Sequence, residues 1–264
     1  MKKYWHVFSV SLQETMQHRA SLIMDRVRSM ALLLSLYFLW SALMQNQQSF
    51  LGYSKTQMFT YVLCMNLLRA FVLSTHAWDM VGEISSGRLS GYLMRPIHYI
   101  GFCLARDFSQ KVVFFSSAVV EVTVLVLCLR TSLYIPKIPS SLVFFFLSVC
   151  SAFFIYFFMA FLVSSFAFWT SESSGPLFCF EMLLQFTAGV FFPLDILPHS
   201  LQRMLHVLPF PYLIYFPLSI YLEKIPRAEI IQGLGMQILW IGFMFWASKA
   251  VWRRGLSVYT AAGG

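Results

Sequence analysis

Charged residues are scarce in this 264-residue chain. They make up 11% of the sequence, whereas 58% of the residues are hydrophobic and 18% are aromatic. Soluble domains carry about 25% charged residues, so this composition excludes an ordinary soluble domain and indicates an integral membrane protein. The net charge of +8 comes from basic residues that mostly flank apolar runs, as membrane topology requires. Nucleic-acid binding is therefore not expected.

Catalytic and metal-binding motifs are also missing. The sequence has no Walker-type phosphate loop, dinucleotide turn, paired-histidine zinc motif or serine nucleophile elbow. The six histidines are scattered, and the five cysteines show neither close pairing nor metal-type spacing. No cleavable signal peptide is expected, because the first apolar run begins near Ser29, after a long polar lead. We expect no catalytic, metal or cofactor site.

Apolar runs predict an all-α membrane protein with about six transmembrane helices. Within residues 1–28, apolar residues recur at helical spacing. This segment therefore predicts an interfacial helix before the first span. The predicted spans are residues 30–44, 57–78, 112–130, 141–169, 177–192 and 230–252. The first of these is shorter than the roughly 20 residues that a bilayer requires.

Prolines interrupt the apolar segment 193–226. Helix breaks at this density are tolerated where the backbone is buried in protein or lies at the membrane interface. This segment therefore predicts short external helices that partly re-enter the bilayer. Its prolines include Pro193, Pro198, Pro209 and Pro211.

The segment 79–111 is the one long charged stretch between two apolar runs. Its basic residues Arg88, Arg95, Arg106 and Lys111 indicate that it faces the cytoplasm, as do the basic residues beside both termini.

Within that loop, residues 83–93 predict one amphipathic helix. Ile84, Leu89 and Leu93 form its apolar face, and Arg88 faces water. Gly87 either permits close approach of another backbone or ends the helix. A helix lying on lipid headgroups is an alternative to one that binds a protein.

Three charges lie inside predicted spans: Arg69 in the second, Glu121 in the third and Glu181 in the fifth. A charge facing lipid at mid-membrane costs at least ~2.5–3.5 kcal/mol, so these side chains should turn inward. We expect Arg69 to pair with Glu121 or Glu181 and fix helix packing. A substrate pathway is the alternative.

Four stretches carry a family resemblance: SLQETMQHRASLIMDRVRSM (11–30), EISSGRLSGYLMRPIHYIG (83–101), FTAGVFFPLDILPHSLQRMLHVLPFPYLIYFP (186–217) and VWRRGLSVYTAAGG (251–264). In their order and spacing they resemble the membrane permease subunit of a bacterial ABC transporter of the type-2 exporter superfamily. The resemblance covers nearly the whole chain, which we interpret as a single permease domain, residues 1–264.

The resemblance implies a role for each irregular segment. Residues 1–28 would be a connecting helix and residues 193–217 an external gate. The coupling helix would comprise residues 83–93, with Glu83, Ile84, Gly87, Arg88, Leu89 and Leu93 as its candidate residues. It further implies a bacterial cytoplasmic membrane, both termini cytoplasmic, and a dimer with a second copy or a related permease. A pair of separate cytosolic ATPase subunits would bind ATP, and this chain would bind none.

Two other classes stay open. A secondary transporter should show broken helices in corresponding positions of two halves, and only one proline-broken region is present. An intramembrane enzyme would need a serine–histidine pair, a histidine–carboxylate set or two aspartates at depth. Arg69, Glu121 and Glu181 form no such set. The substrate is not predicted.

Overall fold

Helices make up nearly all of the computed structural model, which describes residues 2–17, 19–45, 49–50, 52–170 and 174–259. One short antiparallel hairpin pairs Phe50 with Tyr53. The α-helices are α1 (Lys2–Gln17), α2 (Arg19–Leu43), α3 (Lys55–Val72), α4 (Ala77–Ser85), α5 (Leu89–Leu93), α6 (Tyr99–Leu129), α7 (Pro139–Ser164), α8 (Ser174–Thr187), α9 (His199–Val207), α10 (Tyr215–Tyr221) and α11 (Arg227–Val258). The remaining elements are β1 (Ser49–Phe50), β2 (Tyr53–Ser54) and the 3₁₀ helices η1 (Ser165–Phe168), η2 (Leu194–Ile196) and η3 (Phe210–Tyr212).

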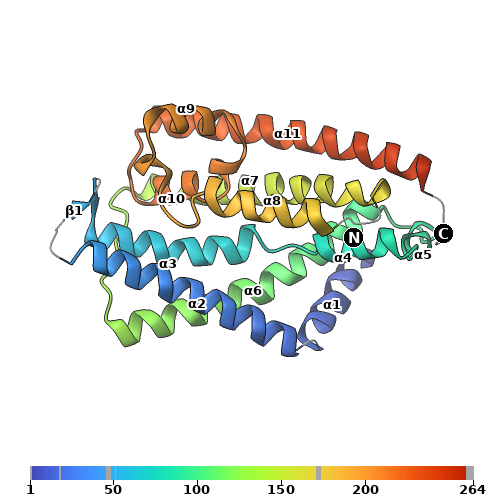
Figure 1. Ribbon diagram of the computed structural model, residues 1–264, viewed down its shortest axis with the longest axis horizontal. Coiled ribbons are helices and arrows are strands. Elements are labelled where there is room, and N and C mark those ends of the chain that lie inside the picture. Colours follow the sequence, from blue (N-terminus) through green and yellow to red (C-terminus); the bar gives the residue numbers. More distant parts are fainter. Residues whose placement is uncertain (1, 18, 46–48, 51, 171–173, 260–264) are drawn as a thin grey trace.

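The long helices run along the long axis of the molecule (Figure 1). The hairpin, α9 and α10 gather at one end, whereas α4 and α5 lie at the other end, close to α1 and to the end of α11. Helix α7 packs against α10 and α11, and α3 packs against α2 and α6. Large buried side chains such as Tyr61 of α3 and Tyr156 of α7 fill the core between them.

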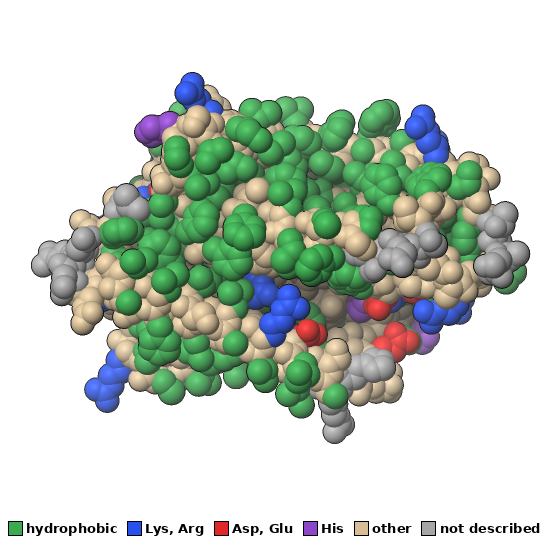
Figure 2. Space-filling model, viewed as in Figure 1, with side chains coloured by type: hydrophobic (Ala, Val, Ile, Leu, Met, Phe, Trp, Pro, Cys, Tyr) green, Lys and Arg blue, Asp and Glu red, His purple; other side chains and the backbone are tan. Residues whose placement is uncertain are grey.

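Within the described residues, four helical segments are long and apolar enough to cross a membrane by length and composition: Lys55–Ser85, Tyr99–Leu129, Pro139–Phe168 and Arg227–Val258. The outer surfaces of α6 and α11 expose large apolar side chains, among them Leu127 and Trp246. Hydrophobic side chains also cover much of the face seen in Figure 2. The predicted all-α membrane class is confirmed.

The predicted number of about six spans is not confirmed. Helix α8 has 14 residues, which cover roughly 21 Å at 1.5 Å per residue, less than the roughly 30 Å of a bilayer core. Helix α2 is longer, but its first part, 19–28, carries four charged residues, so only its second part is apolar. Whether α2 and α8 cross the membrane stays a prediction.

The predicted N-terminal helix does not extend over residues 1–28, and its position at the membrane interface stays a prediction. Helix α1 ends at Gln17, and the rest of the polar lead belongs to α2, which begins at Arg19. Helix α1 packs on α6, where the ring of Tyr4 lies so close to Gly101 that a Cβ there would meet it at 2.9 Å. The charged residues directly before the first apolar run, Asp25, Arg26 and Arg28, are therefore part of the long helix α2.

The proline-rich segment forms the short helices that were expected. Pro193, Pro198 and Pro209 stand at the N-caps of η2, α9 and η3, and Pro211 lies inside η3. Proline suits these positions because the first turn of a helix needs no intrahelical N–H donor. Helix α10 follows and is almost wholly buried. Re-entry into the bilayer and the role of a gate stay predictions.

Exposed Lys137 and Arg95 offer a test of orientation, since they lie in the α6–α7 and α5–α6 connections. In a cysteine-free background, Lys137→Cys should react with an impermeant thiol reagent in intact cells. Arg95→Cys should react only after permeabilisation, because basic loops are retained in the cytoplasm. Mass-tag labelling measures both reactions, and the reverse pattern would overturn the orientation.

Candidate functional site

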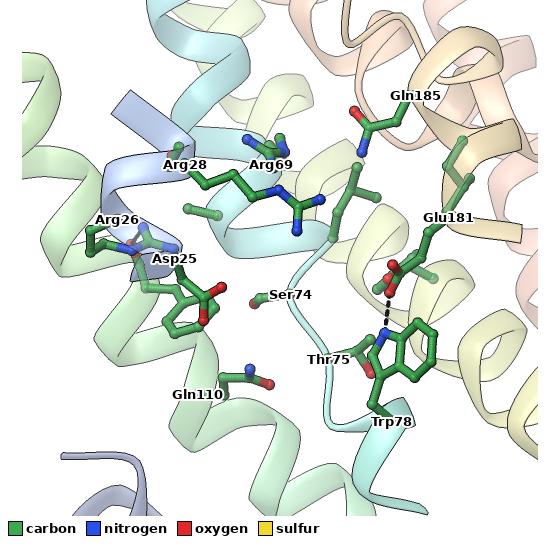
Figure 3. Close-up of a pocket in the computed structure, with 16 residues that line it drawn as sticks. Asp25, Arg26, Arg28, Arg69, Ser74, Thr75, Trp78, Gln110, Glu181 and Gln185 are labelled. Atoms are coloured by element: carbon green, nitrogen blue, oxygen red, sulfur yellow. Dashed lines mark hydrogen bonds between the residues drawn. The ribbon is translucent and has the colours of Figure 1, made fainter. Parts of the chain in front are cut away.

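A polar cavity of about 240 Å³ lies between α2, α3, α6 and α8 (Figure 3). It opens beside residues 73–76, where the chain leaves α3 and has not yet entered α4. The predicted continuous span 57–78 is therefore interrupted. Charged and polar residues that line the cavity are Asp25, Arg26, Arg28, Ser29, Arg69, Ser74, Thr75, Gln110, Glu181 and Gln185.

A buried ion pair from α6 holds this interruption in place. Lys111 Nζ lies 3.2 Å from Asp107 Oδ2, and their side chains are 0% and 2% exposed. The ammonium donates to the carbonyls of Val72, at 3.0 Å, and Ser74. Asp107 Oδ1 accepts the backbone N–H of His76 at 3.2 Å. The pair thus satisfies backbone groups that the end of α3 leaves without helical partners.

Lys111 was interpreted as a basic residue of the cytoplasmic loop, and the structure corrects that interpretation. The side chain is fully buried within the fold. It lies near the rings of Phe153 and Tyr156, 5.3 Å and 5.6 Å from their centroids. Such a charge stabilises packing and carries little information about which side of the membrane the loop faces.

The predicted ion pair of Arg69 with Glu121 or Glu181 is wrong. Glu121 pairs instead with Arg26 of α2, with Nη1 3.6 Å from Oε1. The carboxylate of Glu121 also accepts hydrogen bonds from Ser29, at 3.3 Å, and Asn66, at 3.2 Å. Arg26 reaches Glu121 because the polar lead continues into α2, which brings its charges beside α6.

Glu181 has a different partner. Its Oε1 accepts the indole N–H of Trp78 at 2.7 Å, the contact drawn in Figure 3. Among the described residues, Arg69 has no carboxylate oxygen within 4.0 Å. Arg69 and Glu181 both line the cavity, as the pathway alternative required, whereas Glu121 lies behind it.

Residues 83–93 form two helices, so the prediction of one helix is wrong. Gly87 adopts φ 75°, a conformation that favours glycine, and its N–H bonds Ile84 O at 3.2 Å to end α4. The new helix α5 begins at Leu89. Of the two roles considered for Gly87, the structure shows the terminating one.

Two of the three residues predicted for the apolar face of this segment, Ile84 and Leu89, point inward, and the third, Leu93, is exposed. Glu83, Ile84 and Leu89 are buried within the chain, and Leu89 is 0% exposed. Arg88 is exposed, as predicted. The exposed apolar residues at this end are Leu93 and Met94, which are 41% and 82% exposed.

Four side chains join α4 to α6 beneath this surface. Arg106 donates to Glu83 at 2.5 Å and to Asp79 at 3.0 Å. Asp79 also contacts His76 Nδ1 at 2.5 Å. Tyr99 donates to the second oxygen of Glu83 at 2.8 Å and stacks on Trp252 of α11, with centroids 4.8 Å apart. We call Asp79, Glu83, Tyr99 and Arg106 the α4–α6 network.

The chain matches the model of a family described as ABC-2 family transporter protein over residues 30–263. It belongs to that family. The resemblance is thus confirmed, and the chain is a multi-pass membrane component of a transporter class that works with an ABC ATPase. No curated protein and no solved structure gives a significant match.

Family membership separates the chain from the alternative classes. It favours the permease over a secondary transporter or an intramembrane enzyme. Among the described residues, no cluster of three or more His, Cys, Asp or Glu side chains could hold a metal ion. The ABC-2 family match begins at Met30, so Arg26 and Arg28 precede it.

The end of this ABC-2 family member that carries the candidate gate is tied together by hydrogen bonds. Tyr53 OH donates to Asp195 of η2 at 2.8 Å, which links the hairpin to the prolines. Glu223 accepts Tyr134 OH at 2.6 Å and the N–H of Ile138 at 2.7 Å. The hydrogen bond from Tyr134 to Glu223 raises the pKa of Tyr134 to about 12, because loss of the tyrosine proton would break this contact.

The buried pair at the interruption gives a stability test. Lys111→Met should destabilise the protein by about 3–5 kcal/mol, since it leaves the Asp107 carboxylate buried and unpaired. Adding Asp107→Asn should recover part of the loss. Thermal unfolding of the purified protein measures both effects, with exposed Arg253→Gln as the charge-matched control. Wild-type stability of Lys111→Met would contradict the structural role.

Proposed function

We propose that this chain is the membrane permease subunit of an ABC exporter and couples its polar cavity to separate cytosolic ATPase subunits. ATP is bound by those subunits, and this chain carries no cofactor. It lies in the bacterial cytoplasmic membrane with both termini cytoplasmic, and pairs with a second copy or a related permease. The observation that carries the coupling proposal is the α4–α6 network, which joins two helices that reach the exposed end and also line the cavity, through Trp78 of α4 and Gln110 of α6.

The exposed end supplies the docking surface. Leu93 and Met94 project at the end of α5, with Arg88 and Arg95 exposed beside them. An apolar centre with a charged rim is the usual anatomy of a protein interface. Lys3 of α1 donates to Pro96 O at 3.3 Å and so connects α1 to the same surface. Buried Leu89 is not part of this surface, which corrects the anchor expected from the sequence.

The interior supplies a route for the movement. A force on α5 passes to α4, whose Glu83 and Asp79 hold Arg106 of α6. Helix α4 begins directly after residues 73–76, of which Leu73, Ser74 and Thr75 line the cavity. A small shift of packed helices is amplified when the segment that connects them can adopt two distinct arrangements. The interruption between α3 and α4 is a place where the chain could change between such arrangements. ATP-driven closure of the partner would thus alter the cavity.

Docking predicts a strong effect at Met94. Replacing both Leu93 and Met94 by alanine should cost about 2 kcal/mol or more of binding to the ATPase partner, as for an interface centre. Co-purification measures the loss. Met94→Cys should also cross-link to the partner, whereas Lys55→Cys, exposed on α3, should not. Labelling of position 94 by lipid-phase probes, without cross-linking, would favour the membrane-surface helix.

Coupling predicts a separate phenotype for the network. Glu83→Gln with Arg106→Gln removes both charges of the buried Glu83–Arg106 pair, and Asp79, which is 53% exposed, keeps its contact with His76. ATPase binding and hydrolysis should therefore persist. The ATP-dependent change in thiol reactivity of Val27→Cys, an exposed position on α2 near the cavity, should disappear. Leu89→Ala is the matched comparison, because it should lower stability by about 2–5 kcal/mol through cavity formation. If the thiol reactivity at position 27 still changes with ATP in the double variant, the proposed route is wrong.

A further inference from the structure

Two arginines at the cavity lack a carboxylate partner. Arg26 is occupied, because it pairs with Glu121 and lies over the ring of Phe114, 4.4 Å from its centroid. In the described part of the chain, no carboxylate oxygen lies within 4.0 Å of Arg28 or Arg69. Figure 3 shows their guanidinium groups close together at the top of the cavity. Two neighbouring guanidinium groups repel each other unless an anion lies between them.

The charges nearby do not supply that anion. Arg69 is subject to the like charges of Arg28 and Arg26 and to the attraction of Glu121, which Arg26 already engages. The lining carboxylates are Asp25 and Glu181, and Glu181 is engaged by Trp78. Neither of these carboxylates lies within 4.0 Å of the Arg28 or Arg69 guanidinium group, so the two arginines are not paired although the lining also carries acidic residues.

Polar atoms without partners surround the same cavity. Ser74 Oγ, Gln110 Oε1 and Gln185 Oε1 are buried and have no hydrogen-bond partner among the described residues. Ser74 is only 7% exposed, and Figure 3 shows it facing the interior of the cavity. Buried polar groups are nearly always satisfied, so these atoms indicate a polar ligand. The Ser74 hydroxyl can donate to an oxyanion, as can the amide NH₂ groups of Gln110 and Gln185, whereas the Oε1 atoms of the two glutamines only accept.

Size and surroundings limit the ligand. The volume of about 240 Å³ is below the roughly 300–1,000 Å³ of pockets that enclose drug-sized molecules, so it suits a headgroup. Exposed apolar side chains continue from it on α2 and α8: Ile23, Met24, Val27, Leu183 and Phe186. Figure 2 shows basic and acidic side chains around a hollow within a largely hydrophobic face. An acyl chain could extend over that face while its headgroup enters the cavity.

We propose that this cavity binds a phosphate-type oxyanion, with Arg28 and Arg69 as its charge partners and Ser74 as a further donor. Arginine suits this role because its planar fork matches phosphate oxygens. The anion is either a lipid headgroup or a free phosphate. Binding of the oxyanion does not depend on the exporter proposal. A role for the bound molecule as transported cargo rests on the exporter proposal.

The test is a binding measurement on the purified full-length chain in neutral detergent, without an ATPase partner. Calorimetric titration with dihexanoyl phosphatidic acid should show saturable binding, and dihexanoyl phosphatidylcholine should not bind. Arg69→Gln and Arg28→Gln should each weaken phosphatidic acid binding about tenfold or more, the loss expected for a hydrogen bond to a charged group. Arg253→Gln, which removes an exposed charge elsewhere, should leave the affinity unchanged.

Inorganic phosphate distinguishes the two sources. Phosphate that binds as tightly as phosphatidic acid identifies a soluble anion site, and phosphate that binds at least tenfold more weakly identifies a lipid headgroup site. Absence of binding by both probes overturns the proposal, as does wild-type affinity in both arginine variants. Arg28 is exposed, so Arg28→Gln should fold even if Arg69→Gln does not, and thermal unfolding checks both. Failure of the Met94 cross-link with intact anion binding would reject the coupling proposal alone.

Discussion

The buried pair of Lys111 and Asp107 is the interaction on which the rest of the structure depends. A helix that stops inside an apolar environment leaves carbonyl groups that water cannot satisfy. Lys111 donates to two of the carbonyls at the end of α3, and Asp107 accepts the N–H of His76 just before α4. One ion pair on α6 therefore permits the interruption of α3. Without that interruption, α3 would continue as one rod and the cavity beside residues 73–76 would not exist.

The same stretch of α6 serves the cavity and the exposed end. Arg106 holds α4 from one side through Glu83 and Asp79, and the adjacent Asp107 holds the start of α4 through His76. Gln110, one turn further along α6, lines the cavity. Movement of α4 relative to α6 must therefore disturb the cavity wall. This shared support is why the coupling proposal concerns a helix pair and does not depend on the short helix α5 alone.

Sequence patterns predicted the features that depend on local chemistry. Apolar runs located α6, α7 and α11, and prolines marked the short helices around α9 and α10. The interruption after α3 was not predicted, because residues 73–76 contain neither proline nor glycine, and the polar residues Ser74, Thr75 and His76 are also compatible with the end of a span. Nor could spacing identify the partner of Glu121, since packing of α2 on α3 and α6 brings Arg26 to it. Gly87 did carry a local signal, and its positive φ made the terminating interpretation correct.

The deep charges fall into two kinds that their partners distinguish. Lys111 and Glu121 are each neutralised by a charge from this chain, and Glu181 accepts a hydrogen bond from Trp78, so their positions follow from packing. Partly buried Arg69 and the exposed Arg28 beside it lie among like charges, and within the described part of the chain neither has a carboxylate oxygen within 4.0 Å. An uncompensated charge within a membrane protein is costly, and a fold that only needed packing at position 69 would gain stability from an apolar residue. The absence of a carboxylate within 4.0 Å, among the residues that the structure describes, therefore separates these two arginines from the structural charges and makes the surface that they line the candidate ligand site.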